Sequence, residues 1–181
     1  MRGEKDFSTR DLPYRIRRAE EADAEKLVKV RLQIDGETEN MDREHGEDYI
    51  DSLGFKELIK ADEEAKHNLF LVAEVGSDIV GFSRCAGSHL QRMAHQIEFG
   101  VGVRRDFWGH GIGKNLLRES ISWAEANKIV KMTLRVLETN SAAIQLYQKL
   151  GFEIEGVLKM DKLLSDGEFY DTILMARFNF A

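Results

Sequence analysis

The chain has 181 residues, 43% of them hydrophobic and 9% aromatic, so it can bury one sizeable core and is short for two. Its 26 basic and 32 acidic residues leave a net charge of -6, which argues against nucleic acid as a partner. An acidic surface could favour a cationic substrate, although a charge of this size more often serves solubility. No apolar run approaches the ~18 residues of a membrane span, and the single cysteine, Cys85, excludes an internal disulfide. We therefore expect a cytoplasmic protein without membrane association.

The first half of the chain carries signals for both helix and strand. The acidic residues at 20–23 favour the positive end of a helix, and a polar stretch over 36–46 precedes a second helical region. Two apolar runs joined by Gly76-Ser77-Asp78 predict a β-hairpin. In chain order we expect an N-terminal tail at 1–13, a strand at 14–18, helices at about 20–32 and 49–59, and hairpin strands at 69–75 and 79–85.

The second half alternates strands and helices more regularly. Val130, Met132, Leu134 and Val136 alternate with polar residues, the period-2 pattern of a half-buried strand. In chain order we expect a strand at 95–103, a helix at 114–126, a strand at 130–136, a helix at 140–150, and strands at 152–157 and 170–178. The sequence thus predicts a mixed α/β fold with about seven strands and three or four helices.

A glycine-rich segment, Gly109-His110-Gly111-Ile112-Gly113-Lys114, lies between a predicted strand and a predicted helix. Backbone N–H groups and the positive end of the helix would converge there, which is typical of a phosphate-binding loop. Glycine permits close approach of the phosphate and a positive φ. The alternative is a flexible turn before a helix.

Two familiar nucleotide motifs fail at this segment. A Walker loop ending at Lys114 needs glycine at Trp108 and Ser or Thr at Asn115. A dinucleotide fingerprint starting at Gly109 needs a third glycine where Lys114 stands. A nucleotide-binding enzyme is therefore a weak alternative.

Residues 108–113, Trp-Gly-His-Gly-Ile-Gly, resemble the coenzyme A loop of the GNAT superfamily, whose pattern is Gln or Arg, two residues, Gly, one residue, then Gly or Ala. Trp108 departs from that pattern in the way seen in the branch that resembles ribosomal-protein N-terminal and spermidine acetyltransferases. Residues 140–152 resemble the closing helix of the family almost letter for letter, and residues 98–103 and 167–171 resemble two of its strands. The resemblance covers about residues 14–178 and is weakest over 36–66.

This resemblance implies a GNAT-type fold, with a central, mostly antiparallel sheet splayed at the coenzyme A site. It implies one acetyltransferase domain over 14–181, with acetyl-CoA as cosubstrate and no metal. The partner is then an amine acceptor, and a homodimer is among the alternatives. The residues that the resemblance assigns to cofactor binding are Val101, Val103, Trp108, Gly109, His110, Gly111, Ile112, Gly113, Lys114 and Asn140.

The resemblance also assigns catalytic roles. It places the hydroxyl of Tyr147 beside the sulfur of coenzyme A, where it would protonate the departing thiolate; the alternative is a core tyrosine. Glu98 is the candidate base, acting through a water, and could equally be an exposed strand glutamate. Asn140 would reach the pantetheine amides, or cap its helix, or both. Val101 and Val103 belong to the strand whose backbone N–H groups would stabilise the oxyanion.

The residues leave several functional alternatives open. An acetyl-cysteine at Cys85 would give ping-pong transfer, but a buried strand thiol is the better reading. A non-catalytic acyl-CoA-binding module would not need Tyr147, Asn140 and Glu98 together. The acceptor could be a polyamine, an amino acid, an antibiotic or a protein amino terminus, with its groove expected along residues 30–60 and 160–170.

Overall fold

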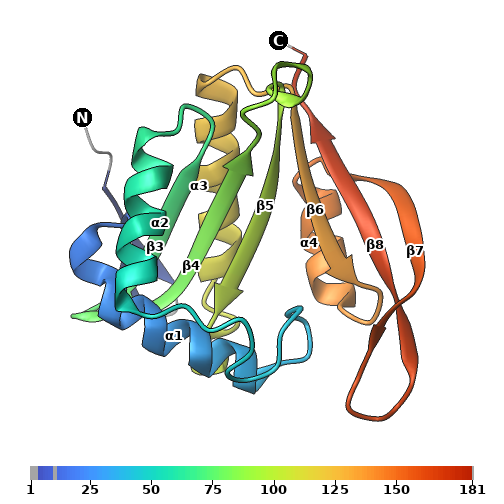
Figure 1. Cartoon of the computed structure of the whole chain (residues 1–181), viewed down its shortest axis with the longest axis horizontal. Coiled ribbons are helices and arrows are strands. Elements are labelled where there is room, and N and C mark those ends of the chain that lie inside the picture. Colours follow the sequence, from blue (N-terminus) through green and yellow to red (C-terminus); the bar gives the residue numbers. More distant parts are fainter. Residues whose placement is uncertain (1–3, 10–11, 181) are drawn as a thin grey trace.

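The computed structural model describes residues 4–9 and 12–180, which form a sheet flanked by helices (Figure 1). The helices are α1 (Ala24–Glu37), α2 (Ser52–Glu64), α3 (Ile112–Ala126) and α4 (Ser141–Lys149). The strands are β1 (Lys5–Thr9), β2 (Leu12–Arg18), β3 (Leu69–Val75), β4 (Asp78–Gly87), β5 (Gln96–Val103), β6 (Lys131–Leu137), β7 (Glu153–Leu163) and β8 (Phe169–Phe178). No helix among these residues is long and apolar enough to cross a bilayer.

The eight strands form one sheet in the order β1-β2-β3-β4-β5-β6-β8-β7. Every neighbouring pair is antiparallel except β5 and β6, which are parallel. The expected fold class, a mixed and mostly antiparallel sheet with three to four helices, is confirmed with one strand more than the seven expected.

The additional strand lies in the segment that we expected to be an unstructured tail. Residues 5–9 pair with β2, and the ring of Phe7 stacks on Tyr14 with centroids 5.4 Å apart. Lys5 pairs with Glu119 of α3 at 2.6 Å. The expectation of a tail is corrected for residues 5–9 and 12–13, while residues 1–3, 10 and 11 lie outside the described part of the chain. One apolar residue in five gives no period-2 pattern from which the strand at 5–9 could be predicted.

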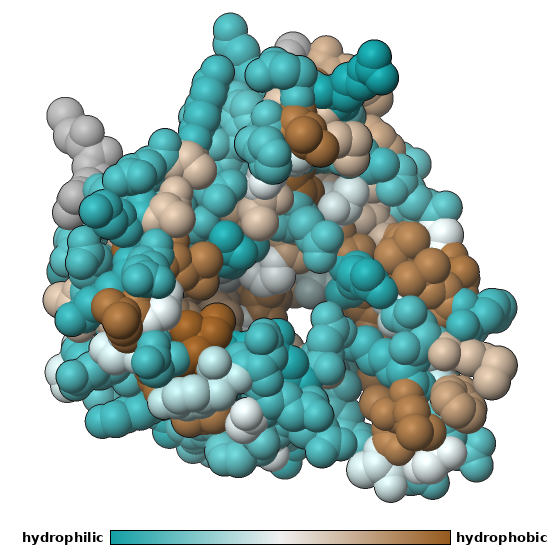
Figure 2. Space-filling model, in the orientation of Figure 1, coloured by the Kyte–Doolittle hydropathy of each residue, from teal (hydrophilic) through white to brown (hydrophobic). Residues whose placement is uncertain are grey.

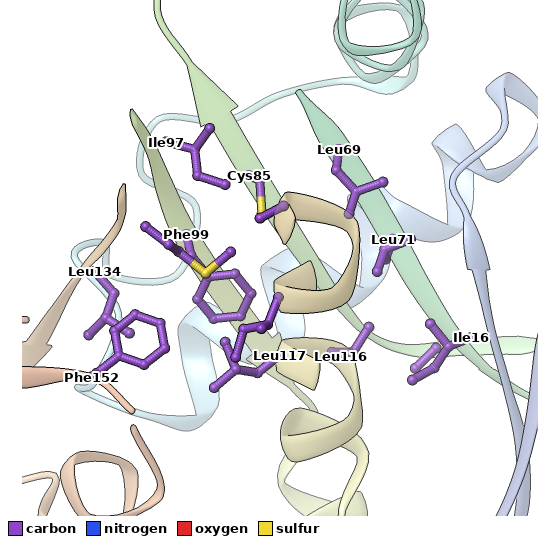
Figure 3. Packing of buried hydrophobic residues seen from close by; sticks show 14 of the residues in the cluster. Ile16, Leu69, Leu71, Cys85, Ile97, Phe99, Leu116, Leu117, Leu134 and Phe152 are labelled. Atoms are coloured by element: carbon purple, nitrogen blue, oxygen red, sulfur yellow. The ribbon is translucent and has the colours of Figure 1, made fainter. Parts of the chain in front are cut away.

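Helices cover both faces of the sheet, α1 and α2 on one and α3 and α4 on the other (Figure 1). Strand β3 shows why both faces are apolar, since Leu69 and Leu71 pack in one cluster while Phe70 and Val72 pack in the other. Figure 3 shows Leu116 and Leu117 of α3 among the strand residues of the first cluster. Each such buried side chain contributes ~1.5–3 kcal/mol of transfer free energy.

The sheet opens between its two parallel strands. β5 pairs with β4 from Ile97 to Val103, but with β6 only from Gln96 to Glu98. Beyond Glu98 the two strands diverge, as Figure 1 shows at their lower ends. The edge of β5 that faces β6 therefore has peptide groups without a strand partner over this stretch.

Candidate active site

A cleft of about 500 Å³ lies where β5 and β6 diverge, and we call it the splay cleft. Its walls come from β5, the glycine loop, the start of α3, α4, and the end of α1 with the loop after it. Ten residues predicted for the site line it: Val101, Val103, Trp108, Gly109, Gly111, Ile112, Gly113, Lys114, Asn140 and Tyr147. His110 and Glu98 do not line it.

The glycine loop has the backbone geometry that its sequence indicated. Gly109 and Gly111 have φ of 80° and 76°, a region that L side chains rarely adopt. Gly111 is the N-cap of α3, so the first N–H groups of that helix, which lack intrahelical partners, face the cleft end of the loop. Such a helix start suits a phosphate group.

The side chains of Trp108 and His110 in the loop differ in their hydrogen bonding. The indole N–H of Trp108 donates to the carbonyl oxygen of Val103 at 2.7 Å, which ties the loop to the end of β5. Trp108, which stands where the family pattern has Gln or Arg, makes this hydrogen bond through its indole. His110 has its Nδ1 buried without a hydrogen-bond partner among the described residues. Its expected role in cofactor binding stays a prediction.

Tyr147 stands on the α4 wall of the splay cleft. Its ring packs against the first core cluster and lies 5.9 Å from the ring of Phe152. Burial raises the pKa of its hydroxyl to about 12, because the phenolate would lose its hydration. The hydroxyl is therefore a proton or hydrogen-bond donor throughout the neutral range.

The two roles expected for Asn140 are capping of its helix and contact with the pantetheine amides. Its side-chain oxygen accepts from the backbone N–H of Ala143 at 3.3 Å, so it caps α4. The same residue lines the splay cleft. The capping role is confirmed, and the contact with pantetheine stays a prediction.

Glu98 lies at the point where the strands part. It is in register with Ala86 on one side and Thr133 on the other, and its side chain is exposed. Its strand neighbours Ile97 and Phe99 point into the core, so Glu98 projects from the opposite face, which α1 and α2 partly cover. The structure does not bring it into the splay cleft with Tyr147, and its role as base stays a prediction.

Sequence reasoning indicated the end of α1 only as part of an expected acceptor groove over residues 30–60, and it named no residue there. Ile34, Thr38, Asn40 and Met41 all line the splay cleft. Ile34 lies close to Gly102, where an added Cβ would come within 3.3 Å of its side chain. No motif marks these residues, because they act through their place in the fold.

A second cavity, of about 910 Å³, lies between residues 35–45 and residues 161–165 of the β7–β8 hairpin. We call it the acidic chamber, after its lining of Asp35, Glu37, Glu39, Asp42, Glu44 and Asp161. It shares Thr38, Asn40, Met41 and Trp108 with the splay cleft, so the two cavities adjoin. Figure 2 shows an opening here, with a mostly hydrophilic surface around it.

Two contacts join the walls of the acidic chamber. The backbone N–H of Ser165 donates to a carboxylate oxygen of Glu39 at 2.9 Å. Lys162 pairs with Asp42 at 2.6 Å. Residues more than a hundred positions apart in the sequence thus close one cavity.

Cys85 lies on β4 within the first core cluster and is fully buried. Burial raises the pKa of its thiol to about 12. A nucleophilic cysteine needs access and a thiolate, and Cys85 has neither.

Comparison with known proteins agrees with this geometry. The model of the acetyltransferase (GNAT) family matches residues 34–152. L-amino acid N-acetyltransferase AaaT of Escherichia coli K12 is 30% identical over 172 residues, which cover 90% of this chain and 96% of that protein. A GNAT-family acetyltransferase from Streptococcus pneumoniae superposes with a TM-score of 0.88 at 28% identity, covering 92% of this chain and 99% of that one.

A second solved structure shows the fold with its cofactor. yncA of Salmonella typhimurium, solved with acetyl-CoA, has a TM-score of 0.78 at 20% identity and covers 90% of this chain and 92% of its own. The family match spans more than half of the present chain and includes the splayed strand, the glycine loop and α4. The chain therefore belongs to the GNAT family of acetyltransferases, which take the acetyl group from acetyl-CoA.

Proposed function

We propose that this protein transfers acetyl directly from acetyl-CoA to an amine that enters through the acidic chamber. The observation that carries this proposal is the junction of the two cavities, where the splay cleft with Tyr147 meets a second chamber at Thr38, Asn40 and Met41. One cavity suits the donor and the other the acceptor, and the two share these wall residues.

Two features of the splay cleft suit acetyl-CoA, the glycine loop with the start of α3 and the partnerless edge of β5. The glycine loop and the start of α3 would hold the pyrophosphate, because Gly109 and Gly111 have no side chain to block its approach and adopt the positive φ that the loop requires. The partnerless edge of β5 offers backbone groups for the extended pantetheine chain. Bound there, acetyl-CoA supplies a thioester carbonyl for attack.

The transfer needs a neutral amine, because the lone pair of an ammonium is occupied. An alkylammonium has a pKa of ~10, so a base must take its proton. The new bond joins the amine nitrogen to the carbonyl carbon, the carbon–sulfur bond breaks, and its electron pair leaves on sulfur. Backbone N–H groups of β5 near Val101 to Val103 would stabilise the charge that develops on the carbonyl oxygen. Glu98, acting through water, remains our candidate base.

Tyr147 would act on the departing sulfur. Its pKa of about 12 exceeds the ~8.5 typical of a thiol, so complete proton transfer to the thiolate is uphill by this comparison. Its hydroxyl would therefore stabilise the sulfur mainly by donating a hydrogen bond as negative charge develops. Direct transfer is further supported by Cys85, whose burial leaves no accessible thiol there for a covalent acetyl-enzyme.

The name of the Escherichia coli relative makes amino acids one acceptor class to test.

The first experiment measures cofactor binding. At about 100 times its dissociation constant, CoA should stabilise the protein by ~2.7 kcal/mol, and ATP and NAD at equal concentration by much less. A panel of amines with thiol detection of released CoA then measures transfer. Intersecting initial-rate lines are expected for direct transfer. Parallel lines, or a melting temperature raised as far by ATP as by CoA, would contradict the proposal.

A further inference from the structure

The acidic chamber carries information about the acceptor that the family match does not. Its lining holds six carboxylates, already named, against three cationic residues, Arg43, Arg105 and Lys162, which leaves a formal charge of -3 with histidine counted as neutral. Two arginines outside the lining also pair with it, Arg31 with Asp35 at 3.8 Å and Arg135 with Asp161 at 3.1 Å. The chamber is open to solvent, since Glu39, Asp42 and Glu44 are exposed, and it shares four lining residues with the splay cleft, so a ligand held in it would lie next to that cleft. Its charge therefore bears on which amine is accepted.

The cations of the chamber are already engaged. The guanidinium of Arg43 donates to both carboxylate oxygens of Asp35, each at 3.2 Å, and Asp35 is buried. Lys162 pairs with Asp42 at 2.6 Å. The guanidinium of Arg105 lies 5.7 Å from the ring centre of Trp108, at the boundary with the splay cleft. A substrate carboxylate would have to displace Asp35 from Arg43 or Asp42 from Lys162, whereas Arg105 forms no ion pair among the described residues.

Glu37 and Glu39 accept hydrogen bonds from neutral donors and form no ion pair among the described residues. Glu37 accepts from the side-chain amide of Gln33 at 2.7 Å and from the backbone N–H of Arg105 at 2.6 Å. Glu39 accepts from the backbone N–H of Ser165, and this hydrogen bond lowers its pKa. All three donors are neutral, so these hydrogen bonds orient the two carboxylates without pairing them with a cation.

We propose that the acceptor is a primary amine that carries a second cationic group on an aliphatic chain and no carboxylate beside the reacting nitrogen. The second ammonium or guanidinium would lie against Glu37 and Glu39, and the chain along Met41 and Leu137, which also line the chamber. An α-amino acid would instead bring its carboxylate into a negatively charged cavity. This proposal rests on the proposed function and narrows its acceptor.

Matched pairs of amines test it. 1,5-Diaminopentane differs from 1-aminopentane by the second ammonium, and from L-lysine by the α-carboxylate. We expect kcat/KM for 1,5-diaminopentane to exceed both by about tenfold, after allowing for its two equivalent amines, and the advantage to shrink as salt is added. L-Phenylalanine against 2-phenylethylamine repeats the carboxylate comparison without a second cation.

Removing negative charge from the acidic chamber then tests whether that charge causes the preference for the diamine. Glu39→Gln keeps an oxygen that can accept from Ser165, and with Glu44→Gln it removes two charges of the lining. We expect this double variant to reduce the preference for 1,5-diaminopentane over 1-aminopentane by about fivefold. Glu25→Gln with Glu57→Gln, exposed glutamates that line neither cavity, should leave that preference unchanged. Thermal melting and the dissociation constant of acetyl-CoA show that both proteins are folded.

The outcomes separate this proposal from the broader one. Equal or faster transfer to L-lysine or to 1-aminopentane would overturn the cationic acceptor while leaving acetyl transfer intact. A diamine preference that survives the chamber variant would also overturn it, since the charge would then act elsewhere. Binding of acetyl-CoA without transfer to any amine would instead overturn the proposed function and this inference together.

Discussion

The two adjoining cavities are built in different ways. The splay cleft is formed by backbone: glycines of positive φ, the start of α3 and the edge of β5 that β6 leaves unpaired. The acidic chamber is formed by charged side chains on a loop and a hairpin, held together by contacts such as Ser165 to Glu39.

This difference separates what is general in the protein from what is particular to it. Backbone groups can recognise phosphate and amide whatever the side chains are, and they require glycine at defined points, which leaves a motif. Side-chain charges can be exchanged without disturbing the sheet, so the chamber can be fitted to one acceptor. If the comparison holds, changes in the splay cleft should affect every acceptor alike.

The largest expected effect is at Tyr147. Tyr147→Phe keeps the ring and its packing on Phe152, and deletes only the hydroxyl. We expect kcat to fall by ~10²–10⁴ with little change in the dissociation constant of CoA, because the hydroxyl acts on the leaving sulfur. The loss should be the same for every acceptor in the panel.

Tyr49→Phe is a matched control, because it also deletes a phenol hydroxyl and Tyr49 is 58% exposed and outside both cavities. It should behave as the parent protein. Full activity of Tyr147→Phe would leave Tyr147 as a packing residue and remove it from the mechanism.

A smaller effect is expected at the glycine loop. Gly111→Asp places a carboxylate where phosphate should lie and asks an L side chain to adopt a φ of 76°. We expect the dissociation constant of CoA to rise by at least about tenfold, measured by calorimetry on the folded variant.

Gly76→Asp separates charge at the site from backbone strain. Gly76 has a φ of 60° in the β3–β4 turn with nothing within 4 Å of an added Cβ, so its substitution imposes a similar strain away from the cleft. It should lose stability without losing CoA affinity. Equal CoA affinity in both variants would show that the loop lies outside the donor site.

Most of the fold could be predicted from the sequence because its elements carry strong local signals. The hairpin of β3 and β4, the alternating strand β6, and α3 and α4 all lie within a few residues of their expected bounds. β7 runs to Leu163 rather than to about 157, because register shifts and a positive φ at Met160 interrupt its alternation. Those irregularities follow from tertiary pairing and leave no periodic pattern.

The two cavities of the site also differ in how far they could be predicted from the sequence. The splay cleft could be predicted in outline, since its loop and helix are contiguous motifs. The acidic chamber could be anticipated only as a region, residues 30–60 with 160–170, because its walls are 126 positions apart at Glu39 and Ser165. Nothing local in either segment indicates that the two carry a shared cavity or what its charge would be.

The smallest expected effect is an absence of change with pH, and it tests how far the hydroxyl of Tyr147 is shielded from water in the splay cleft. Burial raises the pKa of Tyr147 to about 12, above its ordinary value, so the hydroxyl keeps its proton through the range in which an exposed tyrosine, with a pKa of ~10, would lose it. With an acceptor whose amine is already neutral at about pH 8, kcat should stay level to about pH 10.5. Circular dichroism over the same range would show that the protein remains folded. A fall in kcat with an apparent pKa near ~10 that Tyr147→Phe abolishes would mean that water reaches the hydroxyl. The donor side would then be as solvated as the acceptor side, and the contrast between the two cavities would rest on charge alone.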